Sequence, residues 1–218
     1  MASTNLKNSE IVDRLFNMIG QYGQGDYIGE PISQIEHCLQ AANCAREAGA
    51  SDATVLAALL HDCGQILPQD ILDVQILSKG AELESQTTEL GSDMLLPSGV
   101  SVGRHGHDVI GANYLASLGF PAEVCELVRD HVVAKRYLTA VEEGYYERLS
   151  AASKGSLVFQ GGPFSASEID QFKKDILFRE KVQMRRFDDA AKVIGAKVPP
   201  LESYKDLAKG LLCEEIQG

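Results

Sequence analysis

The segment Leu56-Ala57-Ala58-Leu59-Leu60-His61-Asp62 joins a run of aliphatic residues directly to a histidine and an aspartate. Ser51 stands before this run in a helix-capping position, and residues 52–62 are apolar nearly all round, which predicts a central, buried helix. A carboxylate at the end of such a helix is costly to bury unless it is neutralised, and a metal ion is a common means of neutralising it. The segment therefore predicts a metal site at the end of a core helix.

The histidines of the chain support this interpretation by their spacing. His37 and His61 are 24 residues apart (61 − 37), and His107 and His131 are separated by the same interval (131 − 107). One helical stretch and a connection fit between the members of each pair, so two antiparallel helices can bring each pair to one cavity. Each histidine alone is more simply interpreted as a core or surface residue, but the joint pattern favours a metal centre. The fifth histidine, His105, is predicted to lie in a loop.

Helical periodicity extends through most of the chain. Pro31 and Gly49 bound one expected helix, and Pro121 begins another that continues towards Leu138. Further helices are expected near residues 108–118, 140–152, 167–178 and 180–194. No strand pattern competes with them, so the sequence predicts an all-α fold, a helical bundle that forms a single domain over residues 1–218.

Residues 66–104 interrupt this regularity. They contain two prolines and four glycines, with one short helix expected near residues 70–77. Such a segment is typical of a lid or of a tolerated insertion. We therefore expect a long loop insertion near 66–104.

Composition limits the partners of the protein. Of 218 residues, 20 are Lys or Arg and 31 are Asp or Glu, and the net charge of −11 disfavours nucleic acid and anionic membrane surfaces. The longest apolar run, Val55–Leu60, is too short to span a bilayer, and residues 1–10 have no hydrophobic core typical of a secretion signal. The five cysteines show no metal-binding spacing and are interpreted as reduced thiols. We expect a cytoplasmic protein without a nucleic-acid or membrane partner, and the oligomeric state stays open.

The order and spacing of these residues resemble the HD-domain superfamily, which is named for its His-Asp pair. Within it, the chain is most similar to the mixed-valent diiron oxygenases of the PhnZ type, the 2-amino-1-hydroxyethylphosphonate dioxygenases, which are related to myo-inositol oxygenase. The resemblance covers roughly residues 25–65 and 105–205. It rests on Tyr27-Ile28-Gly29-Glu30, Gln34-Ile35-Glu36-His37, residues 56–62, His107 with Gly111-Ala112, residues 131–138, Gln160-Gly161-Gly162-Pro163, and Arg185 with Asp188.

This resemblance implies two iron ions, one ferrous and one ferric, with O2 as co-substrate. The implied ligands are His37, His61 and Asp188 for one iron, His107 and His131 for the other, and Asp62 as the bridge. Imidazole and carboxylate suit iron, and few protein ligands per metal leave positions open for substrate and O2. The same donors also accept manganese, which the sequence alone does not exclude.

The resemblance also implies an oxyanion clamp for the substrate, formed by Lys135, Ser153 and Arg185. Lys135 follows His131 by four residues, so the two side chains share a helix face. Gln65 is implied to contact the substrate too, but the family carries a histidine at this position. A glutamine cannot become cationic, so we expect it to hold a phosphonate more weakly or to hold a different group.

Tyr27 and Glu30 match a lid pair of the family, although a simple turn is the plainer interpretation. The resemblance implies that Tyr27 closes the open iron position at rest and that Glu30 meets the substrate's ammonium group. The expected activity is oxidative cleavage of the C–P bond of a 1-hydroxy-2-aminoethylphosphonate-type substrate, giving glycine or a related amino acid and phosphate. The alternatives are an HD-type metal-dependent phosphohydrolase acting on a phosphomonoester or nucleotide, and a non-catalytic phosphonate sensor. The Tyr27–Glu30 pair favours the oxygenase, because a hydrolase has no need of it.

Overall fold

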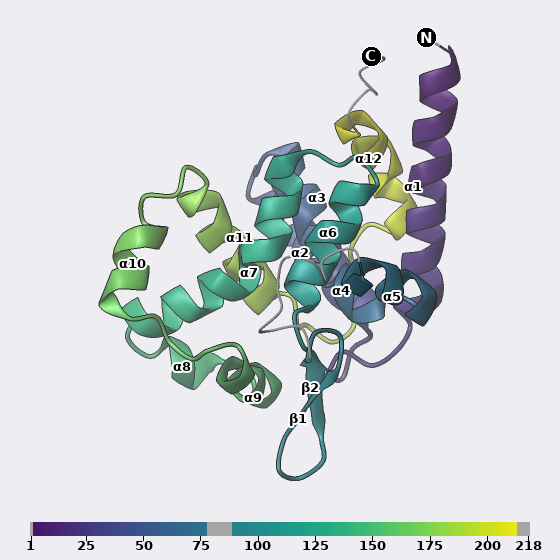
Figure 1. Cartoon of the computed structure of the whole chain (residues 1–218). Coiled ribbons are helices and arrows are strands. Elements are labelled where there is room, and N and C mark those ends of the chain that lie inside the picture. Colours follow the sequence, from purple (N-terminus) through teal and green to yellow (C-terminus); the bar gives the residue numbers. More distant parts are fainter. Residues whose placement is uncertain (1, 78–88, 213–218) are drawn as a thin grey trace.

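The central helix α3 (Asp52–Leu60) organises the fold, as its sequence predicts (Figure 1). The structure is a computed structural model that describes residues 2–77 and 89–212. Residues 53–60 are all buried, and the Ser51 hydroxyl caps the helix by accepting a hydrogen bond from the Thr54 N–H. The remaining elements are α1 (Ala2–Tyr22), α2 (Gln34–Glu47), α4 (Cys63–Ile66), α5 (Gln69–Leu77), β1 (Asp93–Leu95), β2 (Ser101–Arg104), α6 (His107–Ser117), α7 (Ala122–Val141), α8 (Tyr145–Arg148), α9 (Ala151–Phe159), α10 (Ala166–Phe172), α11 (Phe178–Ala190), the 3₁₀ helix η1 (Leu201–Tyr204) and α12 (Lys205–Leu211).

Helices α2, α6, α7 and α11 pack around α3 and the chain that follows it. The main apolar core joins these helices to α1 and α12, which lie side by side at one flank (Figure 1). A smaller aromatic cluster, which includes Tyr137, Phe172 and Phe178, holds α10 and the start of α11 against the far end of α7. The prediction of a helical bundle is confirmed. Among the described residues, no helix is long and apolar enough to cross a bilayer.

The expected helix near 140–152 is instead spread over three helices: the end of α7, the short α8 and the start of α9. Helix α7 continues to Val141, and Gly144 then takes a positive φ of 73° that ends the helical path before α8. Ser150 caps α9 by accepting from the Ser153 N–H. The break turns α9 back toward the bundle, where its serines face the site described below.

The segment near 66–104 contains a β-hairpin that the sequence analysis did not predict. Strands β1 and β2 pair antiparallel, with Asp93 opposite Arg104, and the hairpin projects at the lower end of the bundle in Figure 1. Gly99 closes its turn with a φ of 81° and an N–H donated to the Leu96 carbonyl at 2.8 Å. The expected short helix is present as α5, and residues 78–88 of the expected loop lie outside the described residues. The sequence signal was short: a Pro-Ser-Gly turn between Met94-Leu95-Leu96 and Val100-Ser101-Val102.

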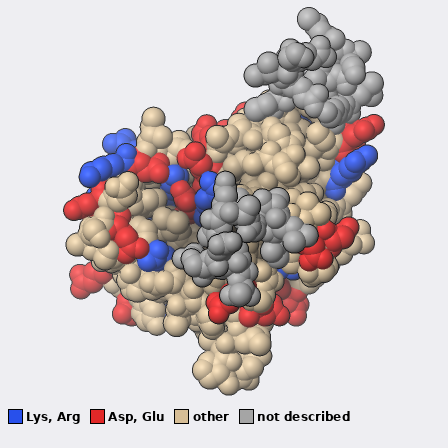
Figure 2. Space-filling model, in the orientation of Figure 1, with Lys and Arg blue, Asp and Glu red and all other residues tan. Residues whose placement is uncertain are grey.

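The surface carries charges of both signs. On the face shown in Figure 2, acidic side chains (red) and basic side chains (blue) are interspersed among uncharged residues. The excess of acidic residues, 31 against 20, therefore does not form a single uniform patch on this face. The chemistry of the protein lies in its interior.

Candidate metal centre

Four helices each present one histidine to the same interior space. His37 lies in α2, His61 follows α3, His107 begins α6, and His131 lies in the middle of α7. Each Nδ1 lies within hydrogen-bond distance of a backbone carbonyl. The four Nδ1-to-oxygen distances are 2.8 Å from His37 to Ala191, 2.9 Å from His61 to Ala58, 3.0 Å from His107 to Arg104 and 2.7 Å from His131 to Val128. A carbonyl only accepts, so every Nδ1 carries the proton and every Nε2 is left free to bind a metal.

These bare Nε2 atoms face one another in two pairs. The Nε2 atoms of His37 and His61 are 3.0 Å apart, and those of His107 and His131 are 3.2 Å apart. Two unprotonated nitrogens at this distance repel unless a cation lies between them. Ligand atoms about 2.1 Å from a shared ion lie about 3.0–3.4 Å from one another, so the spacing fits a metal.

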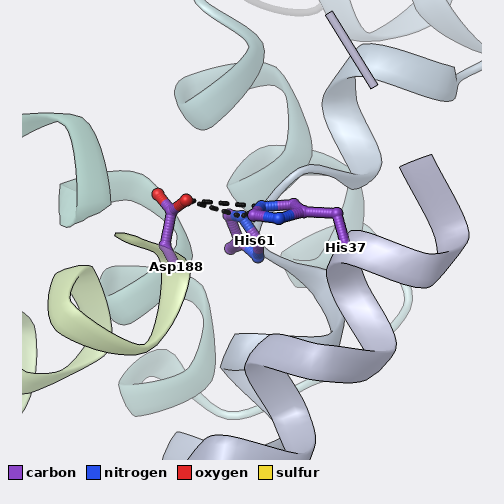
Figure 3. Close-up of side chains that lie close together, drawn as sticks. All are labelled: His37, His61 and Asp188. Atoms are coloured by element: carbon purple, nitrogen blue, oxygen red, sulfur yellow. Dashed lines mark hydrogen bonds and ion pairs between the residues drawn. The ribbon is translucent and has the colours of Figure 1, made fainter. Parts of the chain in front are cut away.

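A carboxylate completes the first pair. Asp188 Oδ1 lies 3.3 Å from His37 Nε2 and 3.9 Å from His61 Nε2 (Figure 3). This oxygen is buried and accepts no hydrogen bond from the described residues. The other oxygen, Oδ2, accepts from Arg185 Nη1 at 2.7 Å. Arg185 thus orients Asp188 so that its unpaired oxygen points at the two histidines.

Asp62 connects the two histidine pairs. Its Oδ1 lies 3.4 Å from His107 Nε2 and 3.8 Å from His131 Nε2. Its Oδ2 lies 3.6 Å from His61 Nε2 and 3.9 Å from His37 Nε2. The structure thus brings all six predicted ligands together, and the donor set fits two metal ions that share one carboxylate.

Burial and neighbouring charges place these groups in the protonation states that a metal requires. Burial lowers the pKa of His131 to about 3 and holds the pKa of His61 below its ordinary value. For Asp62, burial opposes ionisation, but the surrounding imidazoles outweigh it and lower its pKa. The pKa of Asp188 falls well below its ordinary value because Arg185 outweighs burial. Burial therefore favours the neutral imidazole at His61 and His131, and Arg185 favours the ionised carboxylate at Asp188.

A cavity of about 50 Å³ adjoins Asp62, Asp188, His107 and His131. Five of the six predicted catalytic or substrate residues line it: Tyr27, Gln65, Lys135, Ser153 and Arg185. The sixth, Glu30, lines a neighbouring cavity instead, where its Oε1 lies 3.9 Å from Lys192 Nζ. The predicted substrate residues are thus gathered at the metal site, and Glu30 lies beside it.

Lys135 enters the cavity from α7, one helical turn after His131. Its side chain is buried, and Nζ donates to Ser156 Oγ at 3.0 Å. Burial, reinforced by the positive charge of Arg185, lowers the pKa of Lys135 to about 7. Ser153 instead takes part in the cap of α9, where its Oγ accepts from Ser150 at 3.2 Å. Ser156 is therefore the hydroxyl that positions the lysine, and the sequence analysis missed it.

Arg185 is held by more partners than the sequence indicates. Besides Asp188, its guanidinium donates to Asp189, and Nε donates to the Tyr145 hydroxyl at 3.1 Å. Each of its three nitrogens is therefore engaged, although the group still lines the cavity. Neither the Tyr145 contact nor the Asp189 contact to Arg185 was predicted. Asp189 follows Arg185 by four residues on α11, so helical spacing could have indicated its contact.

The Tyr27–Glu30 turn covers the His37 side of the cavity. The Tyr27 ring stacks on the His37 ring with centroids 3.8 Å apart and planes inclined by 11°. Burial raises the pKa of Tyr27 well above its ordinary value, so the phenol is neutral. Gln34 was missed as a site residue: its Nε2 donates to Asp62 Oδ2 at 2.9 Å. It precedes His37 by three residues on α2, a spacing that could have identified it.

Comparison with protein-family models identifies the family of the chain over a range that contains most of the candidate ligands. The family model described as HD domain matches residues 35–152, which include five of the six ligand positions. The chain belongs to the HD-domain family. The prediction of family membership is confirmed.

Relatives of this HD-domain protein align along most of its length. A hydroxymethylphosphonate dioxygenase of Gimesia maris is 36% identical over 195 residues, covering 89% of this chain and 85% of the relative. A [1-hydroxy-2-(trimethylamino)ethyl]phosphonate dioxygenase (glycine-betaine-forming) of Leisingera caerulea is 32% identical over 196 residues, covering 90% and 87%. An uncharacterized protein of Acanthamoeba polyphaga mimivirus is 32% identical over 203 residues, covering 93% and 82%. Two of these three relatives are thus named for dioxygenase action on a 1-hydroxyphosphonate.

Proposed function

We propose that this HD-domain protein is an iron-dependent dioxygenase that cleaves the C–P bond of a small 1-hydroxyphosphonate. The predicted substrate is of the 1-hydroxy-2-aminoethylphosphonate type, and its products are glycine or a related amino acid and inorganic phosphate. The names of the two phosphonate dioxygenase relatives support the reaction class. The cofactors in this proposal are one ferrous and one ferric ion, with O2 as co-substrate.

One observation carries the proposal: two histidine–carboxylate trios, linked by Asp62, lie beneath a cavity lined by hydrogen-bond donors. The trios are His37, His61 and Asp188, and Asp62, His107 and His131. The cavity above them presents Lys135, Arg185 and Gln65, which suit the oxygens of a phosphonate. A redox-active metal pair beside an anion-binding cavity is what oxidative attack on a phosphonate requires.

Bound iron would supply O2 activation and coordination sites for the substrate's oxygens. The protein's own residues have separate tasks. Lys135 and Arg185 offset the phosphonate charge, and Ser156 holds the Lys135 ammonium group in place. Tyr27, stacked on His37, limits the entry of water on that side. In the overall reaction the substrate's C–H and C–P bonds supply the four electrons that reduce O2.

The 2-amino group of the predicted substrate needs a carboxylate partner. Glu30 has this role in the proposal, but in the structure it lines the neighbouring cavity and faces Lys192. Its turn must therefore move for the carboxylate to meet an ammonium group. A substrate without the amino group, such as hydroxymethylphosphonate, needs no such movement.

The reaction is tested by anaerobic iron loading and then exposure to ¹⁸O2 with a panel of 1-hydroxyphosphonates. The panel comprises hydroxymethyl-, 2-amino-1-hydroxyethyl- and 1-hydroxy-2-(trimethylamino)ethyl-phosphonate. We expect phosphate and a carboxylic acid to form only with O2, with ¹⁸O in the products. Equal phosphate release without O2, or from phosphomonoesters with manganese or magnesium, would establish the alternative phosphohydrolase. Binding with no consumption of either phosphonate or O2 would establish the sensor.

A further inference from the structure

The two departures from the family pattern, Gln65 and the segment near 66–104, contact each other. Gln65 lies in the short helix α4, three residues after Asp62, and lines the cavity. Strand β2 of the hairpin passes beside it, and the Arg104 N–H donates to Gln65 Oε1 at 2.8 Å. The hairpin is therefore part of the site.

This hydrogen bond fixes the orientation of the Gln65 amide. A backbone N–H only donates, so the atom that faces Arg104 must be the carbonyl oxygen of the side chain. The donor end, Nε2, gives no hydrogen bond to any other described residue. Gln65 lines both the cavity at the metal site and an adjoining cavity that it shares with Gly103 and Arg104, and the group that it can offer to an anionic ligand is this neutral NH2.

Gly103 provides the room that this orientation needs. A Cβ at residue 103 would lie 2.9 Å from Gln65 Nε2, which is closer than ordinary contact, and 3.4 Å from Oε1. The residue also has a φ of 113°, a backbone conformation that favours glycine. A side chain at this position would push the amide away from its present place.

The Arg104 side chain fastens the strand on both sides of Gln65. Its Nη1 donates to the Gly64 carbonyl at 2.8 Å and to the Leu67 carbonyl at 3.2 Å. Val102, the preceding inward residue, lines the cavity and packs against α9, where a Cβ at Gly155 would lie 3.1 Å from its Cγ1. The segment Val102–Arg104 thus bridges α4 and α9 across one wall of the cavity.

We propose that Val102–Arg104 is a substrate-positioning unit, in which Gly103 and Arg104 hold the Gln65 amide so that Nε2 donates to a phosphonate oxygen. Gly103 and Arg104 act through Gln65 and are positioning residues. The inference rests on the proposed function for the identity of the ligand. It assigns the hairpin a task in substrate binding, which a tolerated loop would not have.

The test compares Gly103→Ala with Gly99→Ala in the iron-loaded protein. Both glycines have a positive φ and lie in the same hairpin, but a Cβ at Gly99 meets nothing within 4 Å. We expect Gly103→Ala and Gln65→Ala each to raise KM for the hydroxyphosphonate about 10-fold with kcat within about twofold, because a hydrogen bond to an anion is lost. Gly99→Ala should leave KM unchanged.

The double variant Gln65→Ala/Gly103→Ala identifies the route of the effect. If Gly103 acts through Gln65, the double variant has the KM of Gln65→Ala alone. A KM of the double variant higher than that of Gln65→Ala alone would overturn the inference. A lowered iron content in Gly103→Ala would also overturn it, because the Arg104 carbonyl accepts from His107 and the effect would then pass through the metal site. Equal KM values for Gly103→Ala and Gly99→Ala would overturn it as well. If Gly103→Ala does not fold, Arg104→Lys replaces it and must show the same dependence on Gln65.

Anaerobic binding of methylphosphonate separates this inference from the proposed function. The probe has the anionic group but lacks the hydroxyl on the carbon that would be oxidised, so its affinity is measurable without turnover. One outcome is that the wild type binds methylphosphonate, that Gly103→Ala and Gln65→Ala bind it more weakly and Gly99→Ala does not, and that no hydroxyphosphonate is oxidised. The positioning role then stands and the proposed oxygenase fails. If oxidation occurs but methylphosphonate binds the wild type and Gly103→Ala equally, the positioning role fails. Absence of methylphosphonate binding to the wild type also overturns it.

Discussion

Replacement of Lys135 by methionine should stabilise the protein while impairing phosphonate binding. Lys135 is buried, and no carboxylate of the described residues lies within 4.0 Å of its Nζ. A pKa of about 7 in place of the ordinary 10.5 means that holding the ammonium ion in the folded state costs about 5 kcal/mol. Methionine fills a similar volume without the charge. After allowance for the lost bond to Ser156, about 1 kcal/mol, and for imperfect packing, we expect a net gain of about 2–3 kcal/mol.

The pH dependence of this gain follows from the lowered pKa. Below pH 7 the Lys135 amine carries its proton in both the folded and the unfolded state, so the full cost is present. Between pH 7 and 10.5 the folded state releases the proton while the unfolded state keeps it, and wild-type stability rises with pH. The advantage of Lys135→Met should therefore be largest at pH 6 and should become a loss of about 2–3 kcal/mol near pH 10.5, where only the lost bond to Ser156 and the imperfect packing remain.

Urea unfolding of the metal-free proteins followed by circular dichroism measures both effects, and Lys181→Met is the matched control. Lys181 is equally buried, but its Nζ lies 2.7 Å from Asp130 and 2.6 Å from Asp175. Its removal leaves those carboxylates unpaired and should destabilise the protein. A loss of stability in Lys135→Met at pH 6, or a change of equal size at pH 6 and pH 10, would refute the reasoning. An unchanged KM for phosphonate would refute the binding role.

Three further predictions concern the metal ligands and the lid. Asp62→Asn should reduce bound iron from two ions per chain to one or fewer, because the shared anionic ligand is lost. Elemental analysis measures the iron content, and two retained ions would contradict the prediction. Arg185→Lys should weaken iron binding about 10-fold, since lysine cannot hold Asp188 and Asp189 together; unchanged competition with a chelator would count against it. Lys192→Met should lower KM for the 2-amino substrate about threefold, because it releases Glu30 from its ion pair. KM for hydroxymethylphosphonate should not change, and equal changes in KM for both substrates would contradict the prediction.

Five of the six candidate metal ligands could be predicted because they depend on local sequence and on helix packing. His61 and Asp62 follow directly from the burial of α3, whose cap and apolar composition are readable in the sequence. The equal spacing within each histidine pair reflects two helices of similar length with a connection. Asp188 was located by resemblance, and the structure shows why it suits the site: its second oxygen is held by Arg185.

The contacts that were missed join elements distant in sequence. The hydrogen bond from Arg104 to Gln65 spans 39 residues, and the one from Lys135 to Ser156 spans 21. Nothing in local periodicity indicates such pairs, because they depend on how α9 and the hairpin turn back over the bundle. Strands of three and four residues also give too little alternation to distinguish them from a loop. The single domain over residues 1–218 and the cytoplasmic location stay predictions.

The charge of the site explains how an acidic protein can take an anionic substrate. The ionised residues around the cavity give no net positive charge: Arg185 contributes +1, Lys135 with its pKa of about 7 contributes at most +1, and Asp62 and Asp188 contribute −2. With a net charge of −11 over the whole chain, the metal-free protein offers a phosphonate no net attraction. One ferrous and one ferric ion would add +5 at the buried end of the cavity and reverse this balance. In the proposed enzyme, therefore, the charge of the bound metal ions favours substrate binding before any chemistry begins. The donors at Gln65, Lys135 and Arg185 then position the anion within the cavity.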